Sequence, residues 1–110
     1  MGELQYVTDA TFESQIRQPR TLALVDFWGN QGAACRQTPP ILRELAESYA
    51  GRVKVVKVHA TENAQTSARY GVRSMPTILA FRDGEVRGQL VGTRKKAEFE
   101  DLIGRLLQDE

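Results

Sequence analysis

The sequence predicts an α/β fold in which a central mixed β-sheet carries helices on both faces. Segments with helical and strand-like hydrophobic patterns alternate along the 110-residue chain, as expected when parallel strands are joined by helices. Two nearly continuous apolar runs, 21–28 and 53–60, have the length and composition of buried strands. The dipeptide Asp83-Gly84 predicts a hairpin, so the sheet should end in antiparallel strands.

Each element follows from the spacing of its apolar residues. Helices are expected at 9–18, 35–51, 61–71 and 93–108. Strands are expected at 21–28, at 53–60 and twice within 77–92, with strand or coil before the first helix. Thr8 or Asp9 is the expected N-cap of the first helix. Pro39 and Pro40 are expected to kink or interrupt the second, because each lacks a backbone donor.

Composition predicts one soluble globular domain, residues 1–110, and a monomer. The chain is 41% hydrophobic and 26% charged, with a net charge of +1, so we expect no nucleic-acid partner and no membrane association. The N-terminus has no apolar signal core, and a single cysteine suits a reducing compartment. We therefore expect a cytoplasmic protein. One histidine and one cysteine exclude a structural zinc site, and no cofactor is expected.

Several residues stand in the order and spacing of one known family. They are Asp26, Trp28, Cys35, Pro40, Lys57 and the SMPT loop at Pro76. Together with the runs VDFW, PIL, YGVRSMPTILAF, DGE and VG, they make the chain resemble the thioredoxins from end to end. The resemblance implies the thioredoxin fold: a parallel core plus a C-terminal antiparallel hairpin, flanked by helices on both faces.

The chain departs from that family at the active site. Thioredoxins carry Trp-Cys-Gly-Pro-Cys, whereas this chain reads Gln31-Gly32-Ala33-Ala34-Cys35. By the resemblance, Gly32 occupies the position of the attacking cysteine. Reduction of a disulfide needs a thiolate to attack and a second thiol to release the mixed disulfide. We therefore expect a defect in dithiol–disulfide exchange. Thioredoxin reductase, the partner that the resemblance implies, should not be coupled to this chain.

The remaining active-site residues leave alternatives open. Cys35 is either a reactive thiol at a helix N-terminus or an inert packing residue. In the family, the aspartate that matches Asp26 assists proton transfer with the second cysteine. The resemblance also makes Lys57 the expected partner of Asp26. Without an attacking thiol, we favour the alternative that Asp26 is a relic that carries a desolvation cost. Replacing it with alanine or leucine should then stabilise the fold.

The resemblance also implies a peptide-binding surface. In the family the bond matching Met75-Pro76 is cis, and the backbone before it pairs with a bound peptide; the alternative is a simple turn. Trp28, Met75, Pro76, Gly92 and Thr93 would form the apolar rim of that surface, although Trp28 could equally belong to the core.

Three functions are compatible with these residues. The preferred one is a thioredoxin-family protein that lacks disulfide exchange and retains at most peptide or partner binding. The second is a single-thiol redox protein, in which Cys35 forms mixed disulfides, becomes glutathionylated or senses peroxide. The third is a thioredoxin protein-disulfide reductase whose active-site loop was rewritten deliberately.

Overall fold

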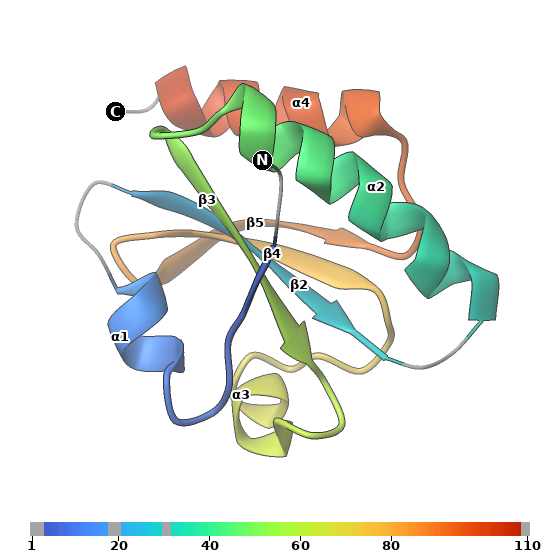
Figure 1. Ribbon diagram of the computed structural model, residues 1–110. Helices are drawn as coiled ribbons and strands as arrows, with labels where there is room; N and C mark the ends of the chain where they lie inside the picture. The colour runs from blue at the N-terminus through green and yellow to red at the C-terminus, as the bar shows by residue number, and fades with distance from the viewer. Residues whose placement is uncertain (1–3, 18–20, 30–31, 109–110) are drawn as a thin grey trace.

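The computed structural model describes residues 4–17, 21–29 and 32–108, without the side chains of residues 32–35. The strands are β1 (Gln5–Tyr6), β2 (Leu22–Trp28), β3 (Val53–His59), β4 (Thr77–Arg82) and β5 (Glu85–Val91). The helices are α1 (Phe12–Ile16), α2 (Gly32–Ser48), α3 (Ala64–Arg69) and α4 (Lys96–Gln108). Every segment expected to be helical or extended is present (Figure 1).

The sheet has the predicted mixed topology, with the strand order β1-β3-β2-β4-β5. Strands β1, β3 and β2 are parallel, whereas β4 runs antiparallel to β2 and β5 antiparallel to β4. Asp83 and Gly84 join β4 to β5 with φ angles of 54° and 80°, the left-handed conformation that a two-residue hairpin turn requires. The expected C-terminal hairpin is therefore confirmed.

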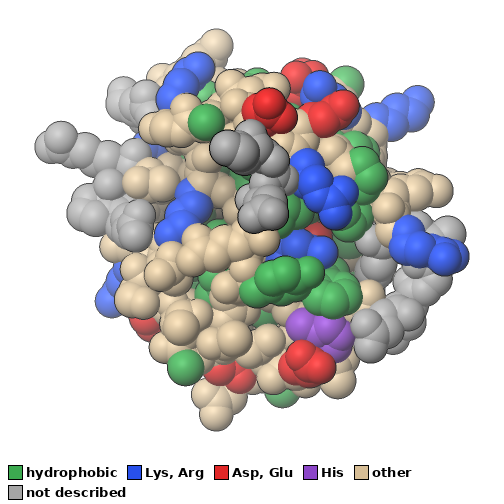
Figure 2. Space-filling model, viewed as in Figure 1, with side chains coloured by type: hydrophobic (Ala, Val, Ile, Leu, Met, Phe, Trp, Pro, Cys, Tyr) green, Lys and Arg blue, Asp and Glu red, His purple; other side chains and the backbone are tan. Residues whose placement is uncertain are grey.

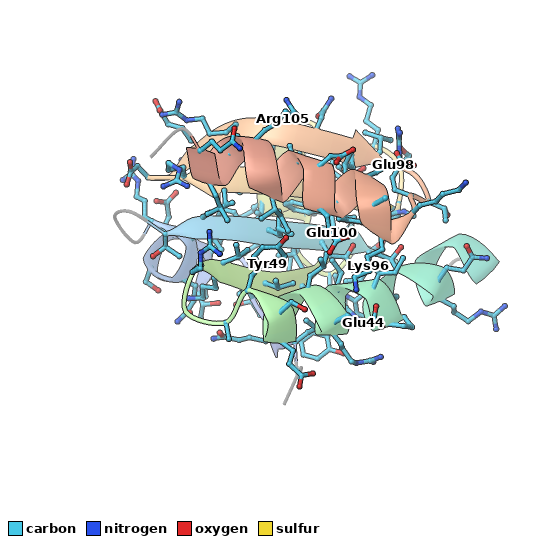
Figure 3. All side chains as sticks on the ribbon, turned by 90° about the horizontal axis from the view of Figure 1, so that it is seen from above. Glu44, Tyr49, Lys96, Glu98, Glu100 and Arg105 are labelled. Atoms are coloured by element: carbon cyan, nitrogen blue, oxygen red, sulfur yellow. The ribbon has the colours of Figure 1, made fainter. Side chains whose placement is uncertain are left out.

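The sheet separates two hydrophobic clusters, one on each face. Leu22 and Leu24 of β2 pack with residues of α2 and α4, while Val25 and Phe27 pack on the opposite face with Phe12 of α1. This division follows from the two-residue period of a strand. Figure 1 shows α2 and α4 above the sheet and α1 and α3 below it. Figure 3 shows α2 and α4 side by side, and Lys96 Nζ lies 3.5 Å from Glu44 Oε2 between them.

The start of helix α1 differs from expectation. Helix α1 begins at Phe12 with Thr11 as N-cap, not with Thr8 or Asp9. The Asp9 carboxylate instead accepts hydrogen bonds from the backbone N–H and the hydroxyl of Thr66, at 2.9 and 2.6 Å. Asp9 therefore satisfies an N-terminal donor of α3, a helix distant in sequence.

Helix α2 also differs from expectation. It begins at Gly32, three residues earlier than predicted, and continues through Pro39 and Pro40 as one helix, so the expected interruption is wrong. Each proline removes one hydrogen bond, and the buried apolar stripe of Leu42 and Leu45 holds the following turns against the sheet. Within the described residues, no helix is long and apolar enough to cross a membrane.

Candidate functional site

The site lies where β2 ends and α2 begins. Trp28 is the last residue of β2, and Gly32 and Cys35 both lie in the first turn of α2. The side chain of Cys35 is outside the described part of the structure, so the reactivity of its thiol stays a prediction. Because the chain contains one cysteine, no second sulfur from the same molecule can join it in a dithiol.

A buried acid lies beneath this junction. Asp26 is 1% exposed, and no described group donates a hydrogen bond to its Oδ1. Burial raises the pKa of Asp26 to about 7, and the positive charge of Lys57 partly opposes that rise. Asp26 and Lys57 are direct neighbours in the pairing of β2 with β3. The carboxyl group can therefore hold or release a proton near neutral pH.

The ammonium group of Lys57 lies against aromatic rings. Its Nζ is 4.5 Å from the centroid of the Trp28 ring and 5.4 Å from that of Tyr6. Lys57 is only 8% exposed, and cation–π contacts strengthen when the cation is desolvated. Lys57 therefore acts on Asp26 through space, without a hydrogen bond to Oδ1.

The loop before β4 meets the end of β5. The Met75–Pro76 peptide bond is cis, and the N–H of Gly92 donates to the carbonyl of Pro76 at 2.8 Å. Gly92 has a φ of 85°, which glycine adopts without strain. Pro76 is buried, Met75 is half-buried and Thr93 is exposed. These four expected site residues therefore lie together at one end of the β4–β5 pair.

Trp28 lies at the end of the neighbouring strand, because Phe27 pairs with Thr77. Its half-buried ring packs edge-on against His59 at 4.6 Å and against Tyr6 at 6.2 Å between centroids. The ring contacts of Trp28 thus involve β1 and β3, and Nε1 is buried with no hydrogen-bond acceptor among the described residues. The half-buried position is the one expected for a residue that serves both core and rim.

Tyr6 and His59 are neighbours of the site, and neither was expected there from the sequence. His59 is opposite Trp28 in the pairing of β2 with β3, and Tyr6 is opposite Lys57 in the pairing of β1 with β3. The Nδ1 of His59 accepts a hydrogen bond from the N–H of Glu62 at 3.2 Å. A confident assignment of β1 as a parallel edge strand would have placed Tyr6 here.

Comparison with known proteins agrees with the fold. The Thioredoxin family model matches residues 3–105. Thioredoxin 1 of Nostoc sp. is 36% identical over 97% of this chain and its own full length. Thioredoxin C-2 of Corynebacterium nephridii is 40% identical over 87% of this chain and 89% of its own. The chloroplastic M-type thioredoxin of Pisum sativum is 35% identical over 97% of this chain, which spans 62% of that longer relative. The chain belongs to the thioredoxin family.

Proposed function

We propose that this thioredoxin-family protein has lost dithiol–disulfide exchange and binds an extended peptide or protein segment at the rim formed by Trp28, Met75, Pro76, Gly92 and Thr93. The observation that carries the proposal is the single cysteine, with Gly32 at the start of α2. Reduction of a disulfide takes two electrons, which a dithiol supplies when it becomes a disulfide itself. One thiol can form a mixed disulfide, but the chain has no second thiol to resolve it.

Peptide binding needs no sulfur, and the rim supports it. An extended peptide can hydrogen-bond to backbone groups at a strand end while side chains on either side contact its residues. Met75 precedes β4 with a half-buried side chain, and the hydrogen bond between Gly92 and Pro76 fixes the adjacent loop. As part of the same proposal, the partner is a protein segment in the cytoplasm, and thioredoxin reductase does not reduce this chain.

The loss of exchange is tested by reduction of insulin disulfides with dithiothreitol. We expect the chain to leave the dithiothreitol rate unchanged, whereas Gly32→Cys, which restores a dithiol, should raise it. Activity of the unmodified chain above the dithiothreitol rate, if abolished by Cys35→Ala, would support the single-thiol alternative and refute the proposal. A pH titration of the Cys35 thiol then decides its reactivity, since an inert thiol keeps a pKa near or above about 8.5.

Peptide binding is tested separately with a displayed library of random peptides. Met75→Glu should abolish selection of binding peptides, because it introduces a charge into the apolar rim. Val86→Glu is the matched control, since Val86 is 43% exposed on β5 and lies outside the rim. The binding proposal fails if the library yields no binders, or if both variants bind the selected peptides as the unmodified chain does.

A further inference from the structure

Two clefts meet at Tyr6 on the β1 edge of the sheet. One has a volume of about 480 Å³ and is lined by Leu4, Tyr6, Arg43 and Lys57. The other has a volume of about 290 Å³ and is lined by Tyr6, Val7, Thr8, Trp28, His59, Glu62 and Asn63. Tyr6 lines both and is 63% exposed, so a ligand can contact its ring from either side. Each volume is within or close to the range of small-molecule sites.

The two clefts form a surface whose chemistry changes along its length. One end presents two cations, Arg43 and Lys57, and none of the described residues that line it is acidic. The middle presents three rings, of which the Trp28 ring contacts those of Tyr6 and His59 edge-on. Figure 2 shows this face, with Lys and Arg side chains above hydrophobic ones, and the histidine with an acidic side chain below them.

Two buried donor groups belong to this surface, Trp28 Nε1–H and the Lys57 ammonium. The Trp28 Nε1–H has no acceptor among the described residues. Lys57 is 8% exposed, and its ammonium rests on ring faces. A charge held out of water interacts more strongly with an incoming opposite charge. An anion at the cationic end would therefore be attracted to Lys57 in addition to its neighbour Asp26.

We propose that this cleft binds a small planar molecule that carries a phosphate group, of the nucleoside monophosphate class. Arg43 and Lys57 bind the phosphate, since guanidinium and ammonium groups are the common phosphate ligands of proteins. The ring of the ligand stacks on the exposed face of Tyr6, a contact that every base can make. The site shares only Trp28 with the peptide rim, and no sulfur takes part in it.

Binding can be followed through the protein itself. Trp28 is the only tryptophan of the chain, so fluorescence excited selectively at tryptophan reports on this cleft, and titration calorimetry gives an independent measure. AMP should bind saturably, inorganic phosphate should compete with it, and adenosine should bind more weakly than AMP. Equal binding of adenosine and AMP would mean that the phosphate contributes nothing to binding. Equal binding of phosphate and AMP would mean that the ring contributes nothing, and either result overturns the proposal.

Variants locate the site. Arg43→Gln should weaken AMP binding by about tenfold or more, the effect of losing one charge-assisted hydrogen bond. Tyr6→Ala should weaken AMP and leave the affinity for inorganic phosphate unchanged. Arg52→Gln is the control, because Arg52 lies beside Tyr49, outside the lining of both clefts, and should bind as the unmodified chain does. No saturable signal by either method at millimolar AMP, or full affinity in Arg43→Gln, would refute the site. Neither result depends on whether the rim binds peptides.

Discussion

Asp26 provides the sharpest test of the energetics of the site. Its pKa is about 7 in the folded chain and near its ordinary value of 3.8 in the unfolded chain. Between these two pH values the folded chain keeps a proton that the unfolded chain has released, so stability falls as pH rises. The contribution of Asp26 to the unfolding free energy should fall by about 1.4 kcal/mol per pH unit, or about 4 kcal/mol in total, and then level off above pH 7.

Asp26→Asn removes the titration while preserving the shape of the side chain. Near pH 4 the folded side chain is uncharged in both proteins, so their difference there reflects mainly hydrogen bonding and packing, with a small contribution from ionisation of Asp26 in the unfolded chain. By pH 8 the variant should have gained about 4 kcal/mol relative to the unmodified chain. Urea unfolding followed by Trp28 fluorescence at a series of pH values measures this difference, in which other titrating groups cancel. Asp26→Leu and Asp26→Ala should show the same pH-dependent gain, offset by their packing changes.

The result that would refute this reasoning is specific. A stability difference that stays constant between pH 4 and 8 would mean that Asp26 does not hold its proton in the folded chain. A difference that moves in favour of the unmodified chain as pH rises would mean that the ionised carboxylate stabilises the fold. In that case Asp26 is structurally useful and not a relic.

Other substitutions test the neighbouring contacts. Lys57→Gln removes the positive charge that lowers the pKa of Asp26. A carboxyl NMR titration should therefore show that this pKa increases above about 7. Hydrogen bonds from Thr66 lower the pKa of Asp9; Asp9→Asn should therefore lower the melting temperature at neutral pH, with a smaller loss as pH falls through that pKa. Gly88→Ala would place a Cβ 2.7 Å from a buried leucine methyl of α4, and urea unfolding should show a loss of about 1–3 kcal/mol. Gly104→Ala, whose Cβ would meet no described atom within 4 Å, should instead gain about 0.5–1 kcal/mol in the same assay.

Most of the fold could be predicted because local patterns and tertiary packing agree. The apolar run of β2 is buried on both faces, and Asp83-Gly84 adopts the turn that its composition favours. Helix starts were less predictable, because a cap can come from anywhere in the chain. Asp9 resembles a local N-cap in sequence, yet it serves α3, and only the packed structure reveals that choice.

The site could be predicted only as far as the family motifs reach. Asp26, Lys57 and the loop at Pro76 were expected from the resemblance, and the structure places the first two as strand neighbours. The position of Tyr6 and the edge-on contact of His59 with Trp28 were not expected from the sequence. Strand β1 is two residues long, too short for a periodic signal, and its residues reach the site through pairing with β3.

Gly32 and Asp26 have different consequences, the first for reactivity and the second for folding stability. Gly32 begins α2 and offers no sulfur that could attack a disulfide. Asp26 lies in the middle of β2 among buried side chains, where its ionisation opposes folding at neutral pH. If the chain lacks disulfide exchange, as proposed above, the proton of Asp26 has no exchange reaction to serve. A role for Asp26 and Lys57 outside disulfide exchange would account for this unfavourable ionisation, and Lys57 lines the cleft in which such a role could operate.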